Sequence, residues 1–187
     1  METDLMTYDR RADHLSEQVV ALFEAYHESI FAYVYRLVGD ADWAHDLVQE
    51  TFLRLFETRN RLPDVDNHRA WVYRIASNLA FNALKRRRHF SWLPWRDSDS
   101  PQQVTLGTHP DPAEDLQVQG QVSRALAKVA PNYRAPLLLY SHFGFNVREV
   151  AQALEISEGA TKTRLYRARE MFRQAYQEEQ LQSEVDK

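Results

Sequence analysis

The sequence predicts an all-α protein with two small helical domains joined by a flexible linker, the C-terminal domain containing a helix-turn-helix. Apolar residues recur at intervals of three and four, the helical period, on both sides of residues 91–113. That middle stretch is rich in Pro and Ser and has no apolar period, which is typical of a linker. Arg and Lys gather on the last predicted helix, after a short turn. We therefore expect an N-terminal arm (1–15), a first domain (16–90), the linker (91–113), a second domain (114–175) and a tail (176–187).

The composition allows two apolar cores and does not favour a cofactor. Of the 187 residues, 44% are apolar, with nine Phe, nine Tyr and four Trp. The absence of Cys excludes disulfides and structural thiolate zinc sites. The seven His show no H-x-x-x-H spacing, so we expect no metal. Residues 1–15 lack the apolar segment of a signal peptide, and no 18-residue apolar stretch occurs. We therefore expect a cytoplasmic, soluble protein without membrane insertion.

The net charge of −4 is unusual for a protein that binds DNA alone, because phosphate neutralisation supplies most of the affinity of such proteins. The basic residues are concentrated at 85–88 and at 162–173, while the arm, linker and tail are acidic. Local basic patches on an acidic chain favour a protein that needs a partner to hold DNA.

The first domain begins with a helix over residues 16–38, which has apolar residues at helical spacing from Val20 and Phe23 to Leu37. Gly39 ends this helix and Asp40 can cap the next one. The inward face of the second helix comprises Ala44, Leu47, Val48, Thr51, Phe52 and Leu55.

A different face of this second helix carries the acidic stripe: Asp46, Gln49, Glu50, Leu53 and Glu57. A stripe of carboxylates with an exposed Leu is compatible with a partner surface. From spacing alone we favour the simpler interpretation, a solvated face with one isolated Leu.

The loop Thr58–Asp66 leads to Asn67, a plausible N-cap for a helix that reaches about His89. One face of this helix combines cations, amides and an aromatic ring, which suits single-stranded DNA because bases stack on aromatic side chains. It comprises Trp71, Arg74, Asn78, Asn82 and Lys85. An equally good interpretation is that Trp71 is a core residue and that the basic end of the helix only complements the helix dipole.

The linker begins with Ser91-Trp92-Leu93-Pro94-Trp95, a segment that is too aromatic for an inert tether. Trp92 and Trp95 either pack back onto the first domain, which we favour, or occupy a groove on a partner.

The second domain begins with a helix over about 115–129, and Pro131 opens the next one. Pro136 lies a turn further on, where we expect a kink or a restart. We expect this helix to end at Gly144.

A helix-turn-helix follows. Asn146 and Glu149 form a predicted capping box for its first helix, and Ser157 caps its second. The predicted inward residues are Val150, Ala151, Leu154, Ile156, Thr161, Leu165, Ala168 and Phe172. The outer, N-terminal part of the second helix presents Ala160, Lys162, Thr163, Arg164 and Arg167. Arg and Lys bind bases and phosphates in a major groove, although a solvated basic face is the alternative.

Three segments together resemble one family. They are D-L-V-Q-E-T-F-L at Asp46–Leu53, W-V-Y-R-I-A-S-N-L-A at Trp71–Ala80, and I-S-E-G-x-x-K-x-R-L-x-R-A-R at Ile156–Arg169. Over roughly residues 16–175 the chain resembles a bacterial RNA polymerase sigma factor of the extracytoplasmic-function (ECF) group. The resemblance implies an alternative sigma factor that binds core RNA polymerase, recognises the duplex −35 element and melts the −10 element.

The resemblance also implies roles for individual residues and partners. Core polymerase would contact Asp46, Gln49, Glu50 and Leu53. The single-stranded −10 element would contact Asn60, Arg61, Trp71, Arg74, Asn78, Asn82, Lys85 and Arg86, with the Asn60–Arg61 loop capturing a flipped base. The −35 element would contact Ala160, Lys162, Thr163, Arg164 and Arg167. The linker would thread through polymerase channels, and an anti-sigma factor would cover these surfaces in unstressed cells.

Three residues depart from the family pattern. Asn82 stands where Asp is frequent, which leaves the −10 preference open. Thr161 replaces an apolar residue and is expected to weaken packing. Glu155 replaces a frequent turn Gly, so a residue with a Cβ must adopt that backbone conformation.

Two other classes of function remain as alternatives. A stand-alone helix-turn-helix regulator would bind duplex DNA without polymerase, but the net charge and the acidic stripe argue against it. A DNA-processing enzyme would need clustered carboxylates or an activated nucleophile. The acids of the second helix instead lie along one stripe and form no constellation with His or Cys, so we expect no enzyme.

Overall fold

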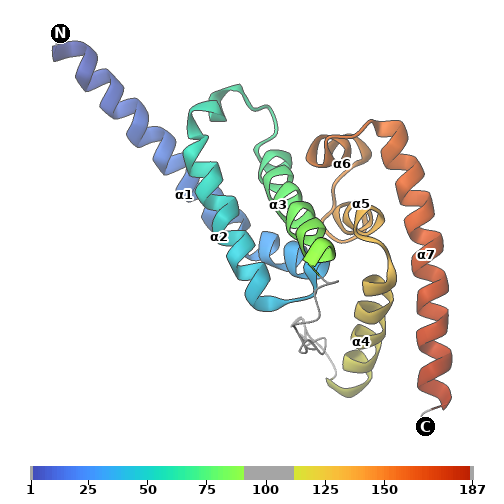
Figure 1. Ribbon diagram of the computed structural model, residues 1–187. Coiled ribbons are helices and arrows are strands. Elements are labelled where there is room, and N and C mark those ends of the chain that lie inside the picture. The colour runs from blue at the N-terminus through green and yellow to red at the C-terminus, as the bar shows by residue number, and fades with distance from the viewer. Residues whose placement is uncertain (1, 91–111, 186–187) are drawn as a thin grey trace.

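The computed structural model describes residues 2–90 and 112–185, with side chains placed for 14–87 and 120–183 (Figure 1). These residues form helices and no strand, which confirms the predicted all-α class. The elements are α1 (Glu2–Val38), α2 (Ala41–Glu57), the 3₁₀ helix η1 (Arg59–Asp64), α3 (His68–Phe90), α4 (Pro112–Lys128), α5 (Pro131–Ser141), α6 (Val147–Leu154) and α7 (Glu158–Val185). The predicted positions of Trp92 and Trp95 lie outside the described residues.

The first domain consists of α1, α2, η1 and α3. Gly39 ends α1 with φ of 76°, and the Asp40 carboxylate accepts a hydrogen bond from the Trp43 amide at 2.9 Å to start α2. All six residues predicted to form the inward face of α2 are buried. Asn67 caps α3 by accepting from the Ala70 amide at 2.9 Å.

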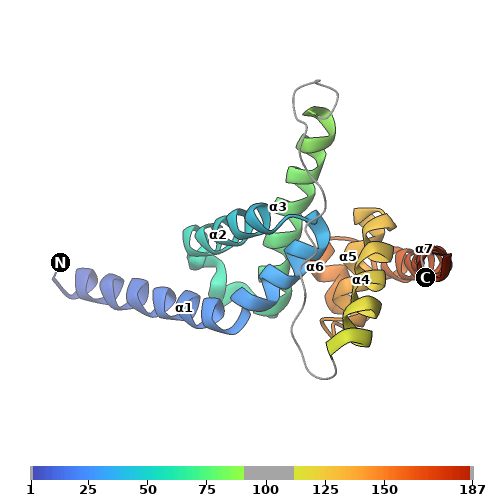
Figure 2. The same cartoon turned by 90° about the horizontal axis from the view of Figure 1, so that it is seen from below.

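The residues predicted as an arm continue α1 instead of preceding it. The helix begins at Glu2, and its N-terminal half projects away from the other helices (Figures 1 and 2). Leu15 and Val19 are already buried, so the packed part of α1 starts near the predicted residue 16.

The second domain consists of α4 to α7, and its predicted caps are present. Asn146 accepts from the Glu149 amide at 3.0 Å, and the Glu149 carboxylate accepts from the Asn146 amide at 2.9 Å. Ser157 accepts from the Ala160 amide at 3.1 Å at the start of α7. Of the two outcomes predicted at Pro136, the restart does not occur, because α5 is one helix from Pro131 to Ser141, and this helix ends before the predicted Gly144.

The predicted tail belongs to α7, which packs along α4 (Figure 1). Its Glu179 carboxylate is 5% exposed and pairs with Arg124 at 2.6 Å and Lys128 at 2.9 Å. Gln121 donates to the Ser183 hydroxyl at 2.8 Å. These contacts give the last turns of α7 a structural role in the second domain.

The two domains share one apolar core. Phe143 and Phe145, from the turn between α5 and α6, pack against Tyr33 of α1 and Tyr73 of α3. The ring centroids of Tyr33 and Phe143 are 5.7 Å apart, and those of Tyr73 and Phe145 are 4.9 Å apart. Helix α6 lies against α3, so the helix-turn-helix sits on the first domain.

Candidate nucleic-acid and partner interfaces

The acidic stripe lies on the solvent face of α2. Asp46, Gln49 and Glu57 are exposed, and Glu50 pairs with Arg54 on the next turn at 2.7 Å. Leu53 is 58% exposed, which is unusual for a large apolar side chain. The stripe therefore offers carboxylates and an amide around an apolar side chain.

Leu53 is not an isolated apolar residue on this side of the protein. Phe56, one turn further along α2, is 42% exposed, and its ring lies 4.2 Å from the Arg59 guanidinium. On α1, Val20 and Phe23 are 56% and 44% exposed, and Phe23 packs edge-on against Phe52 of α2. The helical periodicity of the sequence did not distinguish Val20 and Phe23 from the core residues of α1. The exposed apolar surface is therefore larger than the sequence indicated.

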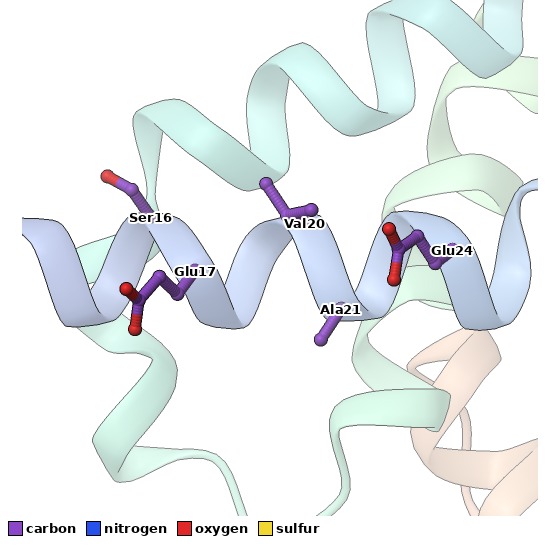
Figure 3. Close-up of a pocket in the computed structure, with 5 residues that line it drawn as sticks. All are labelled: Ser16, Glu17, Val20, Ala21 and Glu24. Atoms are coloured by element: carbon purple, nitrogen blue, oxygen red, sulfur yellow. The ribbon is translucent and has the colours of Figure 1, made fainter.

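A hollow on α1 lies beside this surface and is lined by Ser16, Glu17, Val20, Ala21 and Glu24 (Figure 3). All five residues come from one helix, so they form an open depression and do not enclose a small molecule. Within the described part of the chain, no group of His, Asp and Glu is arranged to hold a metal ion. Nor is any helix in that part long and apolar enough to cross a membrane.

The loop between α2 and α3 presents Asn60 and Arg61 to solvent. Leu62 anchors this loop in the core at 1% exposure, and the His68 ring lies 3.0 Å from the Leu62 carbonyl oxygen. The local 3₁₀ turn bonds the Arg61 amide to the Thr58 carbonyl at 2.9 Å. A fixed loop therefore carries an amide and a cation on its exposed side.

The predicted DNA face of α3 separates into buried and accessible parts. Trp71 is 6% exposed and packs in the core, so its indole is not available to stack on a base in this conformation. Asn78, Asn82, Lys85 and Arg86 are exposed. Lys85 and Arg86 lie toward the C-terminal end of α3. This end of the helix extends beyond the neighbouring helices (Figure 2).

Two residues of that face are already paired with the second domain. The Arg74 guanidinium lies 3.5 Å from one carboxylate oxygen of Glu155, and the Asn78 amide donates to the other at 3.2 Å. Glu155 ends α6 in the left-handed conformation, with φ of 52° and ψ of 43°. The sequence predicted that a residue with a Cβ must adopt this conformation, but it gave no signal that its carboxylate would reach α3.

Further contacts hold α6 and the preceding turn on α3. Asn67 donates to the Glu149 carboxylate at 3.4 Å. The Arg69 guanidinium donates to the Phe143 carbonyl and lies 4.0 Å from the centre of the Phe145 ring. Desolvation raises the pKa of Tyr73, which packs beside these rings, above its ordinary value.

The N-terminal half of α7 presents its basic residues outward. Lys162, Thr163 and Arg167 are exposed, and Ala160 and Arg164 are half-buried. The Arg167 guanidinium donates to the Tyr133 hydroxyl at 3.4 Å. Thr161 faces inward and is fully buried, and its hydroxyl donates to the Ser157 carbonyl at 3.1 Å. The hydroxyl is thus satisfied locally in the apolar core.

Comparison with known proteins identifies relatives of both halves. Family models for Sigma-70 region 2 and Sigma-70 region 4 match residues 22–90 and 119–172. Over 160 residues the chain is 30% identical to the ECF RNA polymerase sigma factor SigL of Mycobacterium tuberculosis, covering 84% of this chain and 88% of that protein. It is 25% identical over 159 residues to the ECF sigma factor SigW of Bacillus subtilis, covering 81% and 85% of the two chains.

A solved structure shows the same fold. The sigma factor RpoE of Bartonella quintana, crystallised with the anti-sigma factor NepR, matches with a TM-score of 0.68 at 21% identity. The match covers 86% of this chain and 98% of that chain.

Proposed function

The chain belongs to the ECF group of RNA polymerase sigma factors. We propose which of its exposed surfaces bind core polymerase and which bind promoter DNA. As a member of this group it is an alternative sigma factor that directs promoter-specific initiation by core RNA polymerase. The stand-alone regulator is therefore not favoured. This assignment of partners to surfaces is supported by one observation: the acidic stripe and the basic side of α7 are both exposed and lie on different domains.

The acidic stripe is the proposed surface for core polymerase. Leu53 would be buried on binding, and the polar side chains of Asp46, Gln49 and Glu50 would pair around it. Burial of such an apolar side chain would supply affinity, and the polar residues around it would form a rim that excludes water.

The promoter contacts divide between the two domains. We assign the −10 element to Asn60 and Arg61 of the loop and to the α3 face of Arg74, Asn78, Asn82, Lys85 and Arg86, with Trp71 supporting this face from the core. The −35 element would bind α7 through Ala160, Lys162, Thr163, Arg164 and Arg167. The protein would work in the cytoplasm beside the polymerase, without bond chemistry of its own.

An anti-sigma factor is the proposed regulator. The RpoE structure contains the anti-sigma factor NepR, and this chain shares the fold of RpoE. A partner that covers the acidic stripe or the α3 face would prevent initiation.

Run-off transcription from genomic fragments, with and without this protein, tests the assignment. We expect transcripts that require both core polymerase and the protein, and we expect a Gln49→Ala/Leu53→Ala double variant to lose them. Absence of core binding, together with tight and salt-sensitive duplex binding by the protein alone, would contradict the proposal.

A further inference from the structure

The contact between Glu155 and the α3 face has a consequence for the whole protein. We propose that the free chain adopts a closed state in which α6 covers part of the −10 face of α3, and that the Glu155 carboxylate takes the place of a DNA phosphate on that face and favours this state. This inference rests on the proposed function of α3, and it adds a regulatory role for a residue outside the promoter-binding sets.

The chemistry of the contact supports the idea that the Glu155 carboxylate replaces a DNA phosphate. A phosphate would use its anionic oxygens to accept hydrogen bonds from a guanidinium and an amide. Glu155 does the same with two oxygens, one 3.5 Å from the Arg74 guanidinium and one 3.2 Å from the Asn78 amide. DNA and Glu155 therefore compete for the same two donors.

The backbone at Glu155 has a left-handed conformation that favours Gly, so the presence of Glu at this position suggests a role for its side chain. A residue with a Cβ is strained in the left-handed region, whereas Gly is not. The turns at Gly39 and Gly144, which also have positive φ, use Gly. At Glu155 the chain accepts this strain, and the side chain that it gains is the one that binds α3.

The closed state is incompatible with simultaneous recognition of both promoter elements. Elements at −35 and −10 are separated by about 85 Å of duplex, at about 3.4 Å per base pair. Lys162 lies seven positions after Glu155, so their α-carbons lie within about 25 Å even in an extended chain. While Glu155 binds Asn78, the basic side of α7 cannot reach the −35 element of a promoter whose −10 element occupies α3. The domains must therefore separate on the promoter.

The contact is also weak enough to be reversible. The side chains of Arg74 and Glu155 are 36% and 56% exposed, and ion pairs with such exposure contribute little because water and salt screen them. The packing of Phe143 and Phe145 against Tyr33 and Tyr73 also holds the domains together, independently of this ion pair. Glu155 therefore acts on the accessibility of the DNA face.

A distance measurement tests the closed state without DNA. The chain has no Cys, so probes can be placed at Glu28→Cys on α1 and Gln174→Cys on α7, both exposed and outside the proposed interfaces. We expect one narrow distance distribution in the free protein and a different, longer one with core polymerase. The charge reversal Glu155→Arg should shift the free protein toward the longer distribution, because it places two cations together. Identical distributions with and without polymerase, or no change in Glu155→Arg, would overturn the proposal.

A binding measurement tests the competition. We use a fluorescent single-stranded oligonucleotide with the non-template −10 sequence of a promoter found by run-off transcription. Glu155→Gln should bind it about twofold to fivefold more tightly than the wild type at low salt. Glu158→Gln, in the first turn of α7, changes the net charge by the same one unit on an exposed residue of the same domain. Equal gains in both variants would show a general charge effect and would exclude competition by Glu155.

The two proposals fail in different ways. If the wild-type protein supports no polymerase-dependent transcription, the proposed function fails, and the distance measurement on the free protein still tests the closed state. If transcription occurs and Glu155→Gln and Glu155→Arg resemble the wild type in both measurements, only the Glu155 inference fails.

Discussion

The guanidinium of Arg134 in α5 donates a hydrogen bond to the main-chain carbonyl of Arg36 at the end of α1, at 3.1 Å. The same side chain donates to the carbonyls of Leu37, Val129 and Ala127. Arg134 therefore satisfies the C-terminal ends of α1 and α4 together, where the helix dipoles favour a cation. Burial lowers the pKa of Arg134 to about 10, a value still far enough above neutral pH for the guanidinium to remain charged.

Replacement of Arg134 should destabilise the protein strongly. Arg134→Met keeps a similar apolar volume but leaves the carbonyls of two helix ends without donors, which we expect to cost about 2–4 kcal/mol. Arg134→Lys should recover only part of the loss, because a single ammonium cannot reach both helix ends. Chemical denaturation measures both values. Arg148→Met, at an exposed position of α6, is the control and should change stability by less than about 0.5 kcal/mol.

The Glu179 cluster should make stability depend on acid pH. Hydrogen bonds from Arg124 and Lys128 lower the pKa of Glu179 below its ordinary value of 4.5. Since the folded pKa lies below the unfolded one, this stabilisation is complete above pH 4.5 and is lost as the pH falls through the folded value. We expect Glu179→Gln to cost about 1–2 kcal/mol at pH 7, and this difference should shrink in thermal melts below pH 4.5.

Its neighbour provides a matched control. Glu178 also pairs with Lys128, at 3.1 Å, but its side chain is 63% exposed. Glu178→Gln should therefore change stability by less than about 0.5 kcal/mol. A loss as large as that of Glu179→Gln would show that burial is not what makes Glu179 important.

Leu53 should supply affinity for core polymerase and little stability. Leu53→Ser removes an apolar side chain that is 58% exposed in the free protein. We expect binding to core polymerase to weaken by about tenfold or more, since burial of a Leu contributes about 1.5–3 kcal/mol, with an unchanged melting temperature. Leu181→Ser replaces another exposed Leu, 64% accessible on α7, and should retain wild-type affinity.

The basic side of α7 should determine the salt dependence of −35 recognition. Each of Lys162→Ala and Arg164→Ala should reduce the slope of log affinity against log salt by about 1 if the residue contacts a phosphate. A residue that contacts a base should instead relax sequence preference at one position. Titration of a −35 duplex with holoenzyme distinguishes these effects. Arg173→Ala, whose side chain pairs with Glu170 at 3.0 Å on the same helix, is the control and should leave both properties unchanged.

Local sequence signals predicted most of the helices because their causes are local. The capping side chains of Asp40, Asn67 and Asn146 bond to amides three residues ahead, and Gly39 supplies a positive φ. The helical period identified every buried residue of α2. At Pro136 the local rule left a kink or a restart open, and the restart does not occur, because α5 continues as a single helix within the packed second domain.

The sequence by itself determined the all-α class, the caps, the inward face of α2 and the family to which the two halves belong, since these depend on residue order and on short-range geometry. Only the tertiary structure decided which exposed residues are free. Trp71 became a core residue, and Arg74 and Asn78 acquired a partner in Glu155, 77 residues beyond Asn78. Val20 and Phe23 follow the helical period but remain exposed. The physical reason is that periodicity places a side chain on a face of its own helix, whereas burial and pairing depend on which distant helix packs there.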